Sequence, residues 1–180
     1  ISLEETRTAI KNGTITFPLV MKPRWGMGSI GIYIAENELE LQVFYDKLSR
    51  EIFNTYLKYE SASDKEACVL IQEKIIGQEY GIEIFNDLDG NYVTTLAKKK
   101  IAMRAGETDM AEVINPKEFE SIGKLISSHL KHIANLDVDI FVTNDGDILV
   151  LEMNCRFGGQ YPFSHLAGAN FPNQIIEWCE

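Results

Sequence analysis

The chain has 180 residues, 45% of them hydrophobic, and its 17 basic and 27 acidic side chains give a net charge of −10. This length suffices for one domain or two small lobes, and no apolar run is long enough to cross a membrane. Nucleic acid is excluded as the main partner, because phosphate backbones require clustered lysines and arginines.

The three cysteines, Cys68, Cys155 and Cys179, are an odd number without CxxC spacing. They indicate reduced thiols of a cytoplasmic protein rather than a disulfide framework or a zinc site. We expect Cys155 to be a packed thiol, not a nucleophile. Because Ile1 is not a natural start, we expect the chain to be a fragment that lacks its N-terminal part.

The N-terminal part alternates helical and strand patterns. A short helix is predicted over residues 1–13 with Ser2 as its cap, followed by strands over 15–22 and 31–35. A longer helix is predicted over 37–59 from the spacing of its apolar residues. These residues are Leu39, Val43, Phe44, Leu48, Ile52 and Phe53.

The rest of the chain is rich in strands. Three strands are predicted over 68–76, 79–86 and 91–103, then a helix from Pro116 to about 134, a hairpin, and a last helix from about Pro172. His129 and His132 are expected at the surface near the end of the first of these helices. Strands joined by hairpins, with few alternations of strand and helix, predict an α+β fold with mainly antiparallel sheets.

The third predicted strand carries the basic residues of this half of the chain. The run Lys98–Lys100 is the only basic block, and on a strand it predicts one solvated face and one inward lysine. Arg104 then precedes a polar loop containing Glu107 and Asp109. It either faces a carboxylate substrate or is a solvated strand end.

The loop Gly26-Met-Gly-Ser-Ile-Gly31 matches the pattern GxGxxG. A dinucleotide site would require a helix that starts at this loop, whereas the residues that follow are strand-like. A glycine loop between two strands can instead form a flap whose backbone N–H groups cover phosphates, with Lys22 on the incoming strand. An ordinary hairpin turn is the alternative.

A second motif runs from Glu73 to Glu79. An apolar strand ends at Glu73, continues through Ile75-Ile76 and Gly77, and meets the second acid. Exposed main chain beside aliphatic residues can bind an adenine edge, and a carboxylate can accept two ribose hydroxyls. In isolation, a hairpin with solvated glutamates explains this segment better.

The C-terminal hairpin places two acids opposite one another. If the Asp145-Gly146 turn has two residues, Val142 faces Leu149 and Asp139 faces Glu152. The Cβ atoms of the two acids would then be roughly 5 Å apart. Such a pair destabilises a sheet unless a cation lies between the carboxylates.

Asn154 and Arg156 follow Glu152 at intervals of two residues and share its face. Two acids, an amide oxygen and a guanidinium on one strip favour a hard cation that holds a phosphate. Solvated acids at an open hairpin end, or a bulge that breaks the register, are the alternatives. The apolar residues Ile148, Val150 and Leu151 indicate a covered strand rather than a free edge.

Three motifs, in this order and spacing, resemble the ATP-grasp superfamily. They are Lys22 before the glycine flap, the segment from Gln72-Glu73 to Glu79, and Asp139 followed by Glu152-x-Asn154-x-Arg156-x-Gly-Gly. The similarity extends from about Phe17 onward and is strongest to members like carbamoyl-phosphate synthase. It implies a fold of two lobes that clamp a nucleotide, a small lobe over about 14–75 and a larger one over 76–180. Cys155 replaces the family's usual proline.

The resemblance assigns roles by position. Lys22 corresponds to a phosphate-binding base and Arg156 to the arginine that steadies the transferring phosphate; both are the expected catalytic residues. The flap corresponds to Gly26, Gly28, Ser29 and Gly31. The adenine hinge corresponds to Glu73, Ile75 and Ile76, the ribose acid to Glu79, and the magnesium ligands to Asp139, Glu152 and Asn154.

The function that the resemblance implies is Mg-ATP-dependent ligation of a small carboxylate-type substrate through an acyl phosphate, with manganese as an alternative metal. The partners expected are ATP, the substrate, and either a second copy of the chain or the missing N-terminal domain. That domain, and a further basic phosphate ligand, would precede this chain. Two other functions remain open: an ATP-binding sensor or subunit module without ligase activity, and an acidic domain with a calcium-stabilised hairpin.

Overall fold

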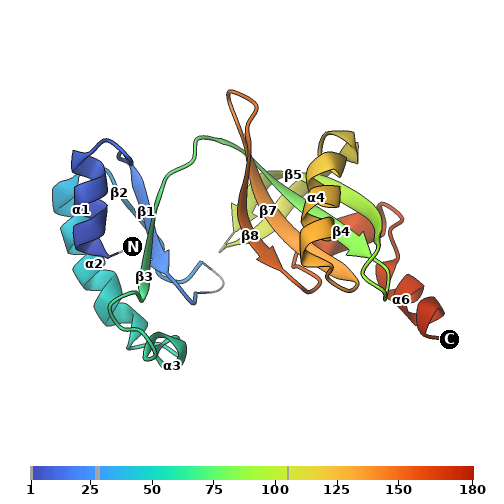
Figure 1. The fold of residues 1–180 in the computed structure, drawn as a ribbon, viewed down its shortest axis with the longest axis horizontal. Coiled ribbons are helices and arrows are strands. Elements are labelled where there is room, and N and C mark those ends of the chain that lie inside the picture. Colours follow the sequence, from blue (N-terminus) through green and yellow to red (C-terminus); the bar gives the residue numbers. More distant parts are fainter. Residues whose placement is uncertain (1, 27–28, 105) are drawn as a thin grey trace. The chain divides into compact units, whose positions relative to one another are not determined.

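The computed structural model describes residues 2–26, 29–104 and 106–180. Contacts between residues divide the chain into two compact units, Ile1–Ile75 and Ile76–Glu180 (Figure 1). Each unit has its own antiparallel sheet and its own apolar core. None of the described helices is both long enough and apolar enough to span a bilayer.

The first unit combines a small sheet with helices. Ser2 caps the first helix through a capping box with Glu5, as the sequence predicts. The sheet has the strand order β2-β1-β3 with antiparallel pairing throughout. Its elements are α1 (Leu3–Lys11), β1 (Leu19–Pro23), β2 (Tyr33–Ala35), α2 (Glu38–Ile52), α3 (Lys58–Ser61) and β3 (Val69–Glu73).

The core of the first unit lies between one face of this sheet and helix α2. Leu19 and Met21 of β1 are buried against Leu41 and Leu48 of α2. The predicted apolar stripe of α2 is wrong at its first two members, since Leu39 is 74% exposed and Val43 is 51% exposed. The helix ends at Ile52 rather than at residue 59, and its buried stripe consists of Leu41, Leu48 and Ile52.

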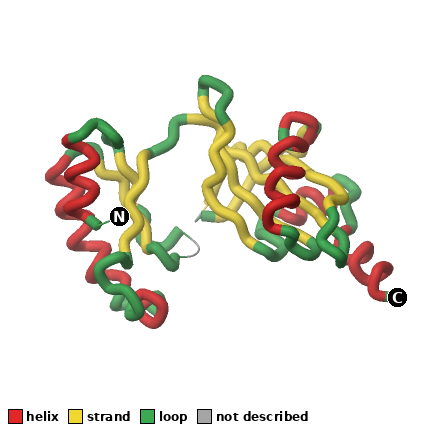
Figure 2. The backbone as a smooth tube through the Cα atoms, viewed as in Figure 1, coloured by secondary structure: helices red, strands yellow, loops and turns green. Residues whose placement is uncertain are grey.

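The second unit contains a five-stranded antiparallel sheet of order β6-β5-β4-β7-β8, seen as the larger group of yellow strands in Figure 2. A short 3₁₀ turn, Pro116–Glu118, precedes its longest helix, α4. The elements are β4 (Gly77–Asn86), β5 (Tyr92–Arg104), β6 (Glu107–Ile114), α4 (Glu120–Leu130), β7 (Asn135–Thr143), β8 (Ile148–Asn154), α5 (Tyr161–Leu166) and α6 (Phe171–Cys179).

The two faces of this sheet differ sharply in chemistry. One face packs with α4 and Phe119 into an apolar core that includes Ile82, Ile84 and Val138. Alternation along the strands sends the other set of side chains to the opposite face. The charged and amide residues of that set, which we call the polar face, are Glu79, Glu83, Lys98, Lys100, Asp137, Asp139, Glu152 and Asn154.

Strand β6 was not predicted, because a polar loop was expected over these residues. It pairs with β5 from Ala97–Ile114 to Arg104–Glu107, and the register shifts twice near Ala102. Its residues are exposed or half-buried, as is usual for a charged edge strand. An edge strand without a buried face leaves little alternation in the sequence from which to predict it.

His132 was predicted at the surface of a helix that continues to residue 134, and this is wrong. Helix α4 ends at Leu130, Lys131 takes a left-handed conformation, and His132 is only 8% exposed. Its Nε2 lies 3.1 Å from the Ile84 carbonyl oxygen, and its Nδ1 has no hydrogen-bond partner within the described residues. Burial lowers the pKa of His132.

We therefore predict that protonation of His132 destabilises the fold. The pKa is lower in the folded state than the unfolded value of about 6.5, so stability is complete above that pH and falls as the pH drops below it. The free energy of unfolding, measured with urea between pH 8 and 5, should therefore decrease less steeply in His132→Gln than in the wild type. The difference in slope should be up to about 1.4 kcal/mol per pH unit.

The exposed His129, on α4, provides the matched control. The variant His129→Gln should retain the pH profile of the wild type. Parallel profiles for His132→Gln and the wild type would show that His132 does not contribute to the acid sensitivity.

Candidate functional site

The β7–β8 hairpin brings Asp139 opposite Glu152, as predicted, but the turn and the register that produce this pair differ from the prediction. The turn is longer than expected, because Thr143 and Asp147 close a three-residue loop and Gly146 takes a positive φ of 89°. The facing of Val142 and Leu149 was therefore wrong, since Val142 pairs with Ile148. A bulge next to Asp139 then restores the predicted pair of acids.

The three predicted metal ligands lie together at the end of this hairpin. Asn154 donates from Nδ2 to Glu152 Oε1 at 3.3 Å, and Glu152 faces Asp139 across the strands. Within residues 2–26, 29–104 and 106–180, no group of three or more acids, histidines or cysteines is placed to hold a metal. A cation here would thus need the amide oxygen of Asn154 with the two carboxylates, a donor set that suits magnesium.

The prediction that β8 is a covered strand is wrong. β8 is an edge strand of the sheet, and Val150 and Met153 are 41% and 47% exposed. Cys155, expected to be packed, is exposed as well. The apolar residues of β8 reflect strand propensity rather than burial on both faces.

Asp139 is bound by two donors on one oxygen. Lys100 Nζ lies 2.8 Å from Asp139 Oδ1, and Gln160 Nε2 donates to the same atom at 3.1 Å. Asp139 Oδ2 has no hydrogen bond or ion pair to the described part of the chain. The carboxylate is thus fixed in orientation while one oxygen stays available for a ligand.

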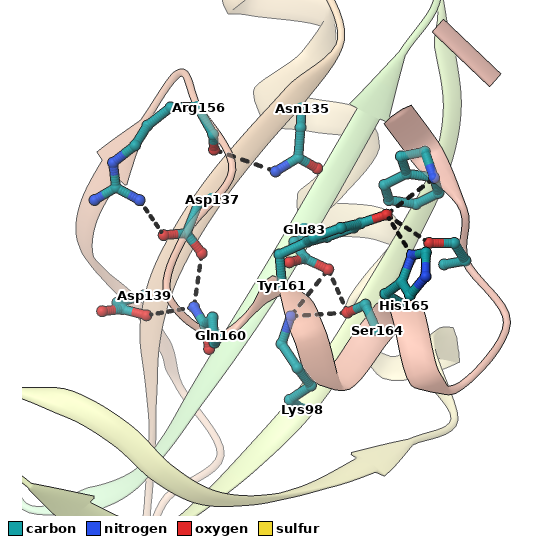
Figure 3. Close-up of polar contacts among 12 residues, drawn as sticks. Glu83, Lys98, Asn135, Asp137, Asp139, Arg156, Gln160, Tyr161, Ser164 and His165 are labelled. Atoms are coloured by element: carbon teal, nitrogen blue, oxygen red, sulfur yellow. Dashed lines mark hydrogen bonds and ion pairs between the residues drawn. The ribbon is translucent and has the colours of Figure 1, made fainter. Parts of the chain in front are cut away.

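Asp137 lies two residues before Asp139 and links the hairpin to Arg156 (Figure 3). Arg156 Nη1 donates to Asp137 Oδ2 at 3.0 Å, and Gln160 Nε2 donates to Asp137 Oδ1 at 2.7 Å. Burial raises the pKa of Asp137, and the bond from Gln160 opposes that rise. Arg156, with a side chain 55% exposed, is therefore anchored at one nitrogen and open to solvent elsewhere.

A buried ion pair lies deeper on the polar face (Figure 3). Lys98 Nζ is 2.9 Å from Glu83 Oε2, and neither side chain is exposed. Ser164 of α5 accepts from Lys98 at 3.0 Å and donates to the same Glu83 oxygen. Burial lowers the pKa of Lys98, against the effect of the Glu83 carboxylate. The pair fixes α5, and with it Gln160, to the sheet.

Three glycines make room for these polar groups. A Cβ atom on Gly81 would overlap the Gln160 amide, one on Gly158 would overlap the Asp137 carboxylate, and one on Gly159 would overlap Glu107. The Gly158-Gly159 pair of the sequence motif is therefore explained here by the close approach of carboxylates to the backbone.

In the first unit, Lys22 lies on the face of β1 opposite the core, since burial alternates along the strand with Leu19, Met21 and Pro23 inward. β1 and β2 flank the glycine loop as an antiparallel pair, as the flap prediction requires. Gly31 has a φ of +72°, and a Cβ there would be 2.8 Å from Leu48. Ser29 also lies in the left-handed region.

The other described residues of the predicted flap and adenine hinge lie at the start of the glycine loop, at the end of β3 and at the boundary of the two units. Gly26 follows β1, and a Cβ there would be 3.1 Å from the Pro23 carbonyl oxygen. Gly28 lies outside the described residues. Glu73 Oε1 accepts from the Thr16 backbone N–H at 2.7 Å, so its carboxylate already has a partner. Ile75 and Ile76 form the junction between the two units.

The predicted ribose acid, Glu79, lies on β4 of the second unit. Glu79 Oε1 is 2.7 Å from Lys100 Nζ, and its side chain is 24% exposed. The lysine run therefore has two inward members, Lys98 and Lys100, rather than the one expected. Arg104 is 80% exposed and forms an ion pair with Asp109 at 2.6 Å, which fits the solvated strand end.

Sequence reasoning missed the partners of the predicted site residues. These are Glu83, Lys98, Lys100, Asp137, Gln160 and Ser164. One signal was present, since lysines on β5 and acids on β7 repeat at intervals of two, and acids on β4 at an interval of four, so that each set shares a face. Gln160 and Ser164 follow the strands on a loop and a short helix, where no periodicity marks them.

We predict that the Lys98–Glu83 pair is strongly coupled in stability. Lys98→Met or Glu83→Met alone should cost about 3–5 kcal/mol, because each leaves a buried charge without its partner. The double variant should lose clearly less free energy of unfolding than the sum of the two single losses, as measured by a double-mutant cycle in urea.

Lys124→Met is the matched control, since the Lys124–Glu120 pair on α4 is solvent-exposed at 3.5 Å. It should change the free energy of unfolding by less than about 1 kcal/mol. Additive costs for the two buried substitutions would contradict the coupling.

Comparison with curated proteins identifies two relatives that are much longer than this chain. The carbamoyl phosphate synthase large chain of Micrococcus luteus is 26% identical over 170 residues, and that of a Nostoc species is 26% identical over 168 residues. Each match covers 86% of this chain but only 14% of the relative.

Solved structures share the fold. The biotin carboxylase domain of Hydrogenobacter thermophilus 2-oxoglutarate carboxylase, solved with MgADP, ADP and bicarbonate, superposes with a TM-score of 0.76 at 20% identity, covering 97% of this chain and 37% of that one. Bacillus anthracis D-alanine–D-alanine ligase with ATP gives a TM-score of 0.57 at 23% identity, covering 93% of this chain and 53% of that one. These neighbours agree with the predicted α+β ATP-grasp architecture.

The sequence profile of the ATP-grasp domain matches residues 15–162, most of the chain. It covers β1 to β8 and reaches the start of α5. On this match, the chain belongs to the ATP-grasp domain family.

Proposed function

We propose that this chain is the Mg-ATP-binding domain of an ATP-dependent ligase that activates a small carboxylate-type substrate. The observation that carries the proposal is the pairing of Asp139 with Glu152, beside Asn154, in a chain of the ATP-grasp family. In such a reaction the γ-phosphoryl group moves from ATP to a carboxylate oxygen, giving ADP and an acyl phosphate. A nucleophile then displaces the phosphate.

The residues of the second unit fit a divalent cation. Asp139 Oδ2, the Glu152 carboxylate and the Asn154 amide oxygen would hold it, and all are oxygen donors. When bound, magnesium neutralises charge on the phosphate oxygens. Arg156, anchored at one nitrogen by Asp137, can place its remaining N–H groups on a phosphate oxygen.

The residues of the first unit support phosphate and adenine binding. Lys22 is on the face of β1 that points away from the core, next to the β1–β2 loop, in which Ser29 and Gly31 have left-handed backbone conformations. Backbone N–H groups of such a loop suit anionic oxygens. The main chain at Ile75, the last residue of this unit, and at Ile76, the first of the second unit, would contact adenine. Glu79 of the second unit would accept from the ribose hydroxyls.

The relatives named above support ATP and magnesium, since the bacterial carboxylase domain was solved with MgADP and bicarbonate and the ligase with ATP. This chain spans about 14% of the length of its curated relatives, so the acceptor substrate of the complete protein stays a proposal at the level of its chemical class.

We predict that Glu152→Gln weakens Mg-ATP binding by about tenfold or more. Loss of a residue that only hydrogen-bonds to a metal ligand already costs about 10–100-fold in metal affinity, and Glu152 is itself a proposed ligand. At saturating Mg-ATP the variant should lose about 1.4 kcal/mol of ligand stabilisation for each tenfold loss. The thermal shift on adding Mg-ATP measures this effect.

Asp147→Asn serves as control, since Asp147 is an exposed acid just before the same strand. It should keep the wild-type shift. An unchanged shift in Glu152→Gln would overturn the metal assignment. Binding of Mg-ATP without release of ADP in the presence of carboxylates would instead indicate a nucleotide-binding module.

A further inference from the structure

Lys100 connects two carboxylates that have different proposed tasks. Its Nζ lies 2.7 Å from Oε1 of Glu79 and 2.8 Å from Oδ1 of Asp139. Its side chain is only 4% exposed. One ammonium therefore binds both the proposed ribose acid and the first proposed metal ligand.

The sheet register sets this geometry. Lys100 lies on β5 and Asp139 on β7, with β4 between them. On β4 the residue paired with Asp139 is Gly81, which has no side chain to fill the gap. Gln160 fills that space and donates to Asp139 from there. Tyr80 pairs with Lys99, so Lys100 lies beside Glu79, and its Nζ reaches Asp139 on the far side of β4.

Electrostatics favour the charged form of this lysine. Burial works against the ammonium, but the Asp139 and Glu79 carboxylates compensate for the hydration that it loses. The ammonium is close enough to neutralise both acids, which it joins at ion-pair distance. It also offsets part of the repulsion between Asp139 and the facing Glu152.

We propose that Lys100 takes the place of the divalent cation at Asp139 while no nucleotide is bound. This proposal rests on the proposed function for the roles of Asp139 and Glu79. The lysine holds Oδ1 and leaves Oδ2 for the metal, and its positive charge disfavours a bare cation. Metal binding becomes favourable when the phosphates of the nucleotide add negative charge, so the cation enters with the nucleotide.

Lys100→Met tests the proposal, with Lys99→Met as the matched control from the opposite face of the same strand. The readout is Mn²⁺ affinity in nucleotide-free protein, from electron paramagnetic resonance of free Mn²⁺. Lys100→Met should bind Mn²⁺ about tenfold or more tightly than the wild type, because a nearby unit charge is removed. Lys99→Met should match the wild type.

Two further variants separate charge from structure. Lys100→Arg retains the charge and should keep the weak Mn²⁺ binding of the wild type. The double variant Lys100→Met/Asp139→Asn should lose the increase in Mn²⁺ affinity that Lys100→Met shows. If Lys100→Met does not fold, Lys100→Gln, which keeps a hydrogen-bond donor, should show the gain instead.

Equal or weaker Mn²⁺ binding in the neutral Lys100 variants, or the same gain in Lys99→Met, would overturn the proposal. Failure of the wild type to bind Mg-ATP would overturn the proposed function instead. The two results are distinguishable, because the Mn²⁺ comparison is made without nucleotide.

Discussion

Charge neutralisation on one face of a β-sheet is the constraint on which the second unit depends. Glu79, Glu83, Asp137 and Asp139 share this face with Lys98 and Lys100, because β4, β5 and β7 are paired in one register. Buried charges are tolerated only when they are paired and hydrogen-bonded. Each carboxylate accordingly has a cationic partner, from Lys98 at Glu83, Lys100 at Glu79 and Asp139, and Arg156 at Asp137.

This requirement extends to the backbone around the face. Gln160 reaches Asp137 and Asp139 together only because Gly81 offers no Cβ, and Gly158 allows the Asp137 carboxylate to approach the loop. Ser164 then ties α5 to the Glu83–Lys98 pair. Glycine at these positions is needed for close packing of polar groups, a role that is independent of any ligand.

The sequence was sufficient for the fold family, the β4–β5 and β7–β8 hairpins and the pairing of Asp139 with Glu152, since these follow from strand patterns and motif order. The hairpin prediction succeeded although its turn had the wrong length, because the bulge beside Asp139 compensated for the additional loop residue. Strand β6 and the burial of His132 were missed, because exposed edges and residues after a helix end carry no periodic signal. The role of Lys100 depends on contacts across three strands, which no local pattern contains.

Burial along the polar face falls from the centre of the sheet to its edge. Glu83 and Lys98 are fully buried, Asp139 is 19% exposed at its side chain, and Glu152 on the edge strand is exposed. A functional site is most precise when its ligand groups are held by packed neighbours on regular strands. In this unit the fixed ion pair lies under α5 and the proposed ligands lie toward solvent, with Asp139 between them. The lysine at that boundary pairs with two half-buried acids, Glu79 and Asp139. In the proposed site it would also set the charge that an incoming cation meets.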